Sequence, residues 1–572
     1  MRKIFLYLPI WIALGFLVQS CDSTQRLTPA SSKPVIQKRV LVGKGAVVSA
    51  HVLASQVGVE IMKKGGNAFD AAIATQLALA VVYPNAGNLG GGGFMVARTA
   101  TGKLIALDYR EKAPSAGHKD MYLDEAGNPR TDWSQDGHLS AGVPGTVAGL
   151  FAAHQYARLP MKTLIQPAIE LAENGFLISE REARSLNGLQ EEFKQFNTTP
   201  PVFINDKGWK AQDRLVQQDL ANTLKRIRDQ GKRGFYEGET ARLIVDEMKR
   251  GKGVISLEDL KNYEAKFREP HVFMYKGYQI VGMPMPSSGG LLVHQMLKMI
   301  EPKPIASYGF LSPEAVQLMT EVERRAYADR AAFMGDADFY QVPVKELASD
   351  NYLQKRMEDF VPNKAGNSQL TQPGRPIGKE SEETTHLSVI DAEGNAVSVT
   401  TTLNNSYGSR TVVGGAGFLL NDEMDDFSIK PGVPNMYGAI GGEANAIAPG
   451  KRMLSSMTPT LVMKENKPFL VVGTPGGTTI PTSVFQTLVN ILDFKLSTED
   501  ALYKPKFHHQ WLPDEIQVEK TFPLPLRKQL ENMGYKVRER GSIGRTEIIR
   551  VLDDGSIEAV ADNRGEDAAV GY

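Results

Sequence analysis

The sequence predicts an α+β fold in which sheets are covered by helices, most simply as one large domain. Three observations support this. Apolar helices are expected before residue 85, paired strands at residues 94–109 and 386–403, and a strand that runs into a helix at residues 469–492. Such segments become stable when sheet and helix bury their apolar faces against each other. Length alone would suggest three or four domains for 572 residues, and we expect that number to be too high.

The composition is that of a globular protein. Hydrophobic residues make up 42% and charged residues 23% of the chain, so a packed core is expected. Lys plus Arg and Asp plus Glu both total 65, and there is no long basic run. Nucleic-acid binding is therefore excluded as a main function.

The N-terminus has the pattern of an export signal. Arg2 and Lys3 precede an apolar run over residues 4–18, which is short for a transmembrane helix. The single cysteine, Cys21, directly follows this run, and its placement resembles the lipobox of bacterial lipoproteins. We expect a signal peptide at residues 1–20, a diacylglycerol on Cys21 and a flexible tether over residues 21–43. The alternative is an accidental or buried cysteine near an ordinary cleavage site.

The first folded segments are predicted to be helical. Leu53–Lys64 has an amphipathic pattern and is stopped by two glycines, while Asn67 or Asp70 can cap a second helix that ends at Tyr83. The second helix is apolar nearly all round, so we expect it to be buried. A glycine cluster at 90–93 then precedes two strands at 94–97 and 104–109.

The middle of the chain is predicted to be mostly helical from residue 145 to residue 356, with no internal repeat. The polar run at 363–383 has almost no apolar side chains, so we expect it to be mobile and exposed. A strand, a turn at 391–395 and a second strand at 396–403 follow. Later, Gly476 and Gly477 lie between the strand at 469–472 and a helix N-terminus.

Most of the familiar catalytic motifs are missing. The sequence has no HExxH zinc motif, no cysteine pair, no GxSxG elbow and no GK[ST] phosphate loop, and the glycine cluster lacks the dinucleotide-binding spacing. His508 and His509 would diverge on a strand, which favours hydrogen bonding over metal binding. No cofactor and no metal ion are expected. Thr384-Thr385-His386 remains, although β propensity alone explains threonines that open a strand.

Long motifs nevertheless resemble one enzyme family. TTHLSVIDAEGNAVSVTTTLNNSYGS, GAGFLLNDEMDDFS, LSSMTPT and GTPGGTT are similar to the small subunit of the γ-glutamyltransferases, and LDYREKAP to the large subunit. The resemblance runs from Lys44 to the C-terminus. It implies an N-terminal nucleophile (Ntn) hydrolase with a four-layer αββα sandwich. It also implies autocleavage between Glu383 and Thr384, which yields a large subunit (residues 44–383) and a small subunit (residues 384–572) that remain a heterodimer.

The resemblance also implies the site residues. Thr384 would be the nucleophile, with its own α-amino group as the base. Thr402 would orient it, and Gly476 and Gly477 would stabilise the oxyanion. The γ-glutamyl head group would be bound at its carboxylate by Arg110, Ser455 and Ser456, and at its ammonium by Asn404, Glu423 and Asp426. Tyr437 would belong to a lid loop at residues 431–442.

The expected activity is therefore that of an exported, lipid-anchored γ-glutamyltransferase and glutathione hydrolase. It would transfer the γ-glutamyl group of glutathione or a related compound to water, an amino acid or a dipeptide. Two alternatives remain open: a relative that acts on glutaryl-cephalosporin or poly-γ-glutamate, and a non-catalytic lipoprotein that binds peptides or amino acids.

Overall fold

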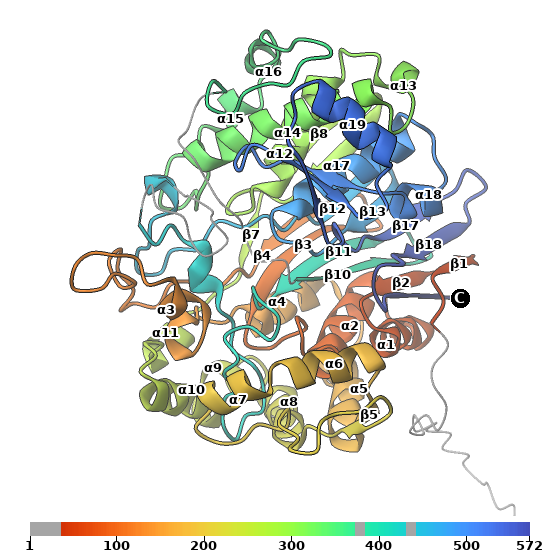
Figure 1. The fold of residues 1–572 in the computed structure, drawn as a ribbon. Coiled ribbons are helices and arrows are strands. Elements are labelled where there is room, and N and C mark those ends of the chain that lie inside the picture. Colours follow the sequence, from red (N-terminus) through yellow and green to blue (C-terminus); the bar gives the residue numbers. More distant parts are fainter. Residues whose placement is uncertain (1–35, 372–383, 431–441) are drawn as a thin grey trace, which may run out of the picture. The chain divides into compact units, whose positions relative to one another are not determined.

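Two seven-stranded antiparallel sheets form the centre of the computed structural model, which describes residues 36–371, 384–430 and 442–572 (Figure 1). Sheet 1 has the strand order β1 (Arg39–Val42), β18 (Ile557–Ala561), β17 (Glu547–Val551), β13 (Lys467–Gly473), β12 (Thr460–Lys464), β9 (Tyr278–Gly282), β8 (His271–Tyr275). Sheet 2 has the order β19 (Ala568–Gly571), β2 (Ala46–Ser49), β10 (Thr385–Ile390), β11 (Ala396–Thr402), β3 (Gly92–Arg98), β4 (Leu104–Asp108), β7 (Lys266–Arg268).

Two smaller sheets lie outside this centre. They are formed by β14 (Phe507–His508), β15 (Ile516–Glu519) and β16 (Val537–Arg540), and by β5 (Phe176–Leu177) and β6 (Arg214–Leu215). Short 3-10 helices are η1 (His138–Ser140), η2 (His154–Tyr156), η3 (Glu423–Asp426) and η4 (Glu443–Asn445).

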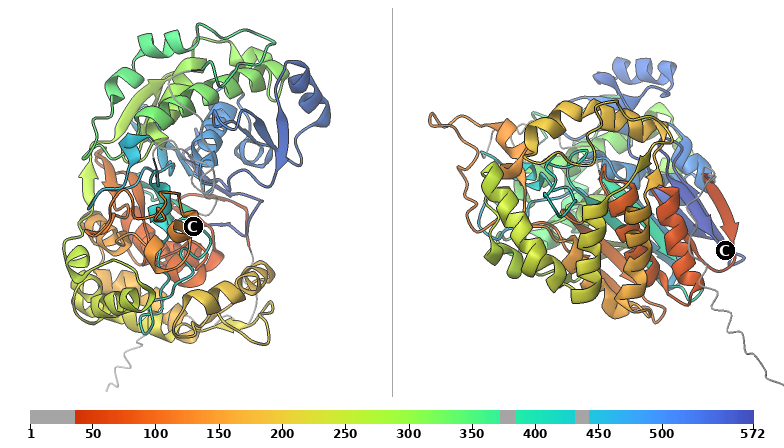
Figure 2. Two further views of the ribbon diagram at one scale, coloured as in Figure 1. Left: turned by 60° about the vertical axis from the view of Figure 1, so that its left-hand side comes forward. Right: turned by 90° about the horizontal axis from the view of Figure 1, so that it is seen from below.

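Helices of the first half of the chain cover the outer face of sheet 2, and they lie side by side in Figure 2. This group comprises α1 (Val52–Lys63), α2 (Ala68–Val82), α3 (Thr131–Gln135), α4 (Thr146–Ala153), α5 (Met161–Asn174), α6 (Glu180–Gly188), α7 (Gln190–Phe196), α8 (Gln218–Gln230), α9 (Arg233–Tyr236), α10 (Gly238–Gly251) and α11 (Leu257–Lys261).

The later helices cover the outer face of sheet 1. They are α12 (Gly289–Ile300), α13 (Ile305–Tyr308), α14 (Pro313–Phe333), α15 (Val344–Leu347), α16 (Asp350–Arg356), α17 (Thr479–Leu492), α18 (Thr498–Tyr503) and α19 (Leu524–Asn532). The order from one side to the other is helices, sheet 2, sheet 1, helices. The expected αββα sandwich is therefore confirmed.

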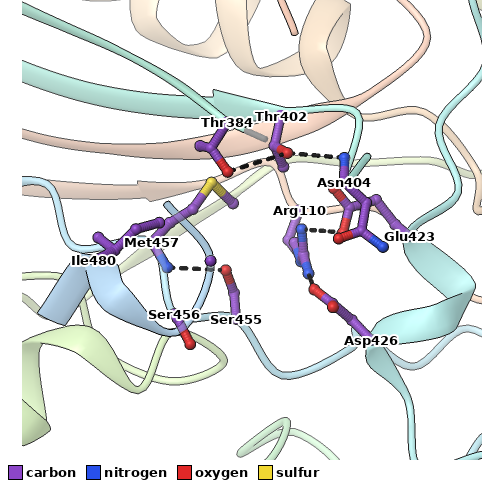
Figure 3. Close-up of a pocket in the computed structure, with 11 residues that line it drawn as sticks. Arg110, Thr384, Thr402, Asn404, Glu423, Asp426, Ser455, Ser456, Met457 and Ile480 are labelled. Carbon is purple, nitrogen blue, oxygen red and sulfur yellow. Dashed lines mark hydrogen bonds and ion pairs between the residues drawn. The ribbon is translucent and has the colours of Figure 1, made fainter. Parts of the chain in front are cut away.

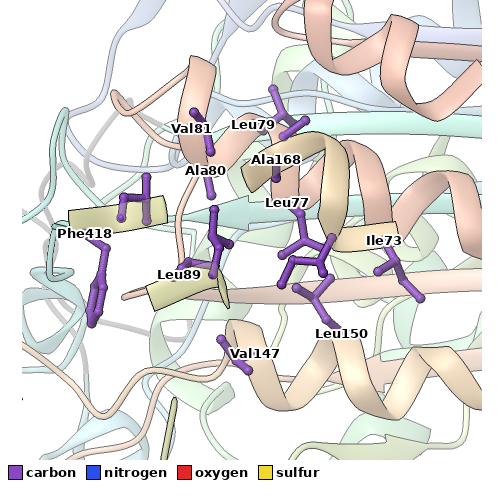
Figure 4. Close-up of a cluster of buried hydrophobic side chains, with 14 of the residues drawn as sticks. Ile73, Leu77, Leu79, Ala80, Val81, Leu89, Val147, Leu150, Ala168 and Phe418 are labelled. Carbon is purple, nitrogen blue, oxygen red and sulfur yellow. The ribbon is translucent and has the colours of Figure 1, made fainter. Parts of the chain in front are cut away.

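Three apolar layers hold the four structural layers together. One lies between sheet 2 and its helices and includes Leu77 and Leu150 (Figure 4). A second lies between sheet 1 and its helices. The third lies between the two sheets, where Val96 meets Val471 and their neighbours. The central strands of the sandwich can thus bury both faces, which explains why β10 and β11 contain no exposed residue.

The early helices agree with the sequence analysis. α1 and α2 begin and end within a residue or two of the predicted positions, and Asn67 and Asp70 together form a capping box at the start of α2. Every residue of α2 is buried, as its all-round apolar pattern predicts. The predicted strand pairs are β3 with β4 and β10 with β11.

Three expectations were wrong in part. The tether predicted for residues 21–43 includes β1, because Arg39–Val42 pairs with β18. The mostly helical middle contains β7, β8 and β9, which complete the edges of both sheets. Finally, the described part of the polar run is anchored by hydrogen bonds in place of apolar contacts: Ser368 donates to the carbonyl oxygen of Trp511 at 2.6 Å and is buried.

All described residues belong to the compact unit Val35–Tyr572. Within these residues, none of the helices combines the length and the apolar character that crossing a membrane requires. Cys21, the predicted signal peptide, the Glu383 side of the expected cleavage site and Tyr437 lie outside the described residues.

Candidate active site

One pocket gathers nearly all of the predicted site residues. Figure 3 shows them converging from both sheets and from the segments that follow β11 and precede β12. The lining residues are Arg110, Thr384, Thr402, Asn404, Glu423, Asp426, Ser455, Ser456, Met457, Gly477 and Ile480. Only Gly476, of the predicted catalytic and binding residues in the described chain, is not part of the lining.

Thr384 and Thr402 meet because of the β10–β11 register. Thr385 pairs with Thr401 and His386 with Thr400, so the next pair along the hairpin is Thr384 opposite Thr402. The Thr384 hydroxyl donates to Thr402 Oγ1 at 3.5 Å, and both side chains are buried (Figure 3). A five-residue turn in the sequence thus sets the partner of the candidate nucleophile.

Asn404 follows β11 in a left-handed conformation, with φ of 78°. Asn tolerates this conformation better than most residues. The turn directs the Asn404 N–H back to Thr402 Oγ1 at 2.8 Å, while its side-chain amide donates to the Asp422 carbonyl oxygen at 3.0 Å. Thr402 Oγ1 is therefore held between the Thr384 hydroxyl and a backbone donor.

Arg110 lies at the end of β4 among three carboxylates. Its guanidinium contacts Glu423 at 2.5 Å and Asp426 at hydrogen-bonding distance (Figure 3). A carboxylate oxygen of Glu111 lies 3.6 Å from the same group. The side chain of Arg110 is 1% exposed and that of Asp426 is 10% exposed. Negative groups thus outnumber the single positive group in a site shielded from water.

Burial shapes the protonation of this cluster. It would lower the pKa of Arg110, but Glu423, Asp426 and Glu111 raise that pKa above its ordinary value, so the guanidinium stays charged. Burial raises the pKa of Glu111 to about 8 and also raises the pKa of Glu423. Neighbouring carboxylates raise both pKa values further, because like charges repel each other. A cation bound beside these carboxylates would lower both pKa values again.

The glycine cluster before β3 allows β3 to approach the site closely. A Cβ on Gly91 would lie 2.1 Å from the Thr402 carbonyl oxygen, and one on Gly92 would lie 2.6 Å from the Tyr109 carbonyl oxygen. Neither contact is sterically possible. These glycines therefore serve packing behind the pocket, in agreement with their lack of dinucleotide-binding spacing.

Ser455 and Ser456 are held by the segment that precedes α12. The Ser455 N–H donates to the Pro286 carbonyl oxygen at 2.9 Å, and the Ser288 N–H and hydroxyl both donate to the Ser455 carbonyl oxygen at 2.8 Å. The Met457 N–H donates to Ser455 Oγ at 3.2 Å. The serine pair thus rests on a built support and is buried at the pocket wall.

Gly476 and Gly477 form the turn between β13 and α17, with φ of 135° and 55°. Their carbonyl oxygens accept from the N–H groups of Thr479 and Ile480 at 3.0 and 3.1 Å. Within the described residues, neither glycine N–H donates to another protein group. A turn of this shape at a helix start offers N–H donors to an anion.

Sequence reasoning missed some parts of the site. Met457 and Ile480 line the pocket as apolar residues, and Glu111 adds a third carboxylate beside Arg110. Their sequence neighbours were identified, so proximity to a motif was the available signal. His508 and His509 diverge as predicted and make hydrogen bonds, to Thr482 and Asp514. Among the described residues, no three His, Cys, Asp or Glu side chains converge in a way that could hold a metal ion.

Comparisons with known proteins relate most of the chain to one family. The model of the Gamma-glutamyltranspeptidase family matches residues 54–572. A glutathione hydrolase proenzyme of Escherichia coli is 45% identical over 533 residues, which cover 92% of each chain. The crystal structure of Helicobacter pylori gamma-glutamyltranspeptidase is 42% identical with a TM-score of 0.56, and covers 60% of this chain and 97% of its own. The crystal structure of a cephalosporin acylase from Bacillus halodurans is 26% identical with a TM-score of 0.81, and covers 96% and 99%.

Proposed function

The chain belongs to the gamma-glutamyltranspeptidase family, and from this premise we propose that it is a γ-glutamyltransferase and glutathione hydrolase with Thr384 as its nucleophile. The observation that carries the residue assignment is the pocket itself. It joins a buried threonine pair to a cationic group, a hydroxyl pair and a surplus of carboxylates. These groups match an acyl donor whose head carries both a carboxylate and an ammonium.

The charges of the pocket support recognition of a zwitterion. The carboxylate of a γ-glutamyl group would pair with Arg110 and accept hydrogen bonds from Ser455 and Ser456. Its ammonium would be received by Glu423 and Asp426, which now share Arg110. The ammonium of a zwitterion therefore supplies the positive charge that balances the carboxylates. Its carboxylate gives the Arg110 guanidinium a further partner.

Maturation begins with the same threonine. The Thr384 hydroxyl attacks the Glu383 carbonyl carbon, the Glu383–Thr384 C–N bond breaks, and an ester to Thr384 Oγ1 forms while the α-amino group takes the proton. Water then opens the ester and leaves Glu383 as a carboxylate. Cleavage thus creates a free α-amino group, which titrates near pH 8 in model compounds and can serve as the general base. The two products remain a heterodimer.

Catalysis then proceeds by acyl transfer. The α-amino group takes the proton of Thr384 Oγ1, which attacks the γ-carbonyl carbon, and the same amine returns the proton to the departing amine. The oxyanion is stabilised by the Gly476 and Gly477 N–H groups, each worth about 3 kcal/mol of barrier in comparable sites. Water or the amine of an acceptor amino acid or dipeptide then takes the γ-glutamyl group from Thr384.

The acylase alternative is disfavoured by the head-group site. A glutaryl group has a carboxylate but no ammonium, so it would leave Glu423 and Asp426 with excess negative charge in a buried site. A binding lipoprotein would need no threonine pair aligned by a hairpin. The 45% identity to a glutathione hydrolase proenzyme of Escherichia coli, against 34% to an acylase proenzyme of a Pseudomonas species, also supports the transferase.

We further propose that the enzyme is exported and is held at the cell envelope by a lipid on Cys21. The support is the sequence alone: a charged start, an apolar run of signal-peptide length and one cysteine directly after it. Expression of the full chain and of Cys21→Ser, followed by detergent phase partition, tests this. The wild type should enter the detergent phase and the variant the aqueous phase.

Intact-mass analysis tests the central proposal. Protein without residues 1–21 should yield two fragments that divide between Glu383 and Thr384, and it should release 4-nitroaniline from L-γ-glutamyl 4-nitroanilide. Thr384→Ala should remain one chain and release none. A well-folded wild type that stays uncut and inactive would overturn the proposal and favour the binding lipoprotein.

A further inference from the structure

Helix α14 passes behind the serine pair, and we propose that its Arg330 is a positioning residue that makes this pair a donor site for the substrate α-carboxylate. The inference rests on the proposed function and deepens it, because Arg330 does not line the pocket. Arg330 is 8% exposed and comes from a part of the large subunit that no sequence motif connects to the site.

Arg330 contacts the Ser456 hydroxyl directly and reaches the backbone of Ser455 through Ser288. Its Nη2 donates to Ser456 Oγ at 3.0 Å, and its Nε donates to Ser288 Oγ at 3.1 Å. The Ser288 hydroxyl in turn donates to the Ser455 carbonyl oxygen at 2.8 Å. One planar guanidinium thus spans the two segments, 286–288 and 455–457, that form this wall.

Arginine can only donate hydrogen bonds, so the direction of these bonds is known. A guanidinium has five N–H donors and no acceptor, so Ser456 Oγ can only accept from Arg330. Its hydroxyl hydrogen must point to a different partner, and Ser456 lines the pocket. Ser288 is oriented in the same way: it accepts from Arg330 and donates onward. An anion in the pocket needs donors, and Arg330 orients the wall to supply them while adding positive potential behind it.

The backbone of the wall has its own support. The Ser455 N–H bonds to Pro286, and the Ser287 hydroxyl donates to the Met457 carbonyl oxygen at 2.6 Å. Loss of Arg330 should therefore disturb the orientation of the hydroxyls more than the path of the chain. One turn earlier on α14, the Tyr327 hydroxyl donates to the Thr478 carbonyl oxygen beside the glycine turn. Residues one turn apart on α14 thus contact the serine segment and the residue that follows the glycine turn.

Competitive inhibitors that differ by the carboxylate test this role. L-Glutamate carries the α-carboxylate, and 4-aminobutyrate is the same molecule without it. In Arg330→Gln, where the new amide can also accept, the inhibition constant of L-glutamate and the KM of L-γ-glutamyl 4-nitroanilide should rise about tenfold. The inhibition constant of 4-aminobutyrate and kcat should stay within about threefold. Arg330→Lys, again a donor only, should recover part of the loss.

Two further variants keep the test decisive. Arg325→Gln, on the same helix, removes a buried ion pair to Glu321 and a second ion pair to the exposed Asp359. It should lower stability without changing the ratio of the two inhibition constants. Ser288→Ala removes the relay by a smaller change. It should raise the inhibition constant of L-glutamate relative to that of 4-aminobutyrate, as Arg330→Gln does. This variant therefore tests the inference even if Arg330→Gln does not fold. Equal weakening of both inhibitors in Arg330→Gln, or an unchanged ratio in Ser288→Ala, would overturn the inference. A wild type that is uncut or inactive would instead refute the proposed function.

Discussion

Thr384 donates its hydroxyl to Thr402 across the end of the β10–β11 hairpin, and Thr402 at the same time accepts the N–H of Asn404. The donor from Asn404 keeps one side of Thr402 Oγ1 occupied and so fixes where the Thr384 hydroxyl can bind. The orientation of the nucleophile therefore depends on the strand that faces it at the same end of the hairpin.

Thr402→Val should slow both maturation and turnover. The isosteric change leaves the Thr384 hydroxyl and the Asn404 N–H without this acceptor, and loss of such hydrogen bonds should cost about tenfold or more in each rate. A time course of chain cleavage on denaturing gels and 4-nitroaniline release from the cleaved fraction measure the two rates. Thr385→Val is the matched control, because Thr385 Oγ1 is buried and makes no hydrogen bond within the described residues. Equal effects of the two variants would argue against orientation by Thr402.

Arg110→Gln should reduce both binding and stability. It leaves Glu423 and Asp426 as buried carboxylates without their cation, and removal of one partner of such a pair costs about 3–5 kcal/mol. Adding Glu423→Gln should restore part of the free energy of unfolding, but not the KM for a γ-glutamyl anilide. Chemical denaturation and steady-state kinetics on the single and double variants separate the two effects. A double variant no more stable than Arg110→Gln would show that the ion pair is not the cause.

The protonation of Glu111 should make stability depend on pH. Its pKa is raised by burial to about 8 from an ordinary value of 4.5, so between these pH values the folded state binds more protons than the unfolded state. Stability from this group is present at low pH and is lost as the pH rises through about 8. The melting temperature of the wild type should therefore fall between pH 5 and pH 9, relative to that of Glu111→Gln. Parallel profiles for the two proteins would contradict the raised pKa.

The same carboxyl group should release a proton when a substrate ammonium binds. The incoming positive charge favours the ionised forms of Glu111 and Glu423, which lowers their pKa. Calorimetry of L-glutamate binding at pH 7 in two buffers of different ionisation enthalpy should reveal proton release in the wild type and less in Glu111→Gln. Identical apparent enthalpies in both buffers for the wild type would exclude this linkage.

Local patterns predicted much of this fold. The capping box at Asn67, the all-round apolar α2 and the strand, turn and strand of residues 385–402 each depend on neighbours in sequence. The turn length even determined that Thr384 faces Thr402. By contrast, β8 and β9 were missed. They pair with each other as a local hairpin, and they join sheet 1 only through the pairing of β9 with β12, which lies about 180 residues away in the chain.

The residues of the candidate site also fall into two groups: those that sequence motifs indicate and those that only the tertiary structure reveals. Residues inside long family motifs, such as Arg110 and Ser455, could be assigned from the resemblance. Met457 and Ile480 were not assigned, since an apolar residue beside a motif is most often core. Arg330 was missed because only tertiary packing brings α14 behind the serines. Long-range support of this kind leaves no local pattern in the sequence.

Gly476→Ala should damage catalysis more than Gly477→Ala. At Gly476, φ of 135° is a conformation that L residues rarely adopt, and a Cβ would lie 2.5 Å from Thr479 Oγ1. Gly477, with φ of 55°, lies in the left-handed region that an alanine enters for about 1–2 kcal/mol. If the turn supplies oxyanion donors, Gly476→Ala should lower kcat by about 10²–10³ with little change in KM.

Gly555→Ala, at a surface turn with φ of 84° and open space around the new Cβ, controls for backbone strain alone and should leave kcat unchanged. A Gly476→Ala enzyme with normal kcat would remove this turn from the mechanism.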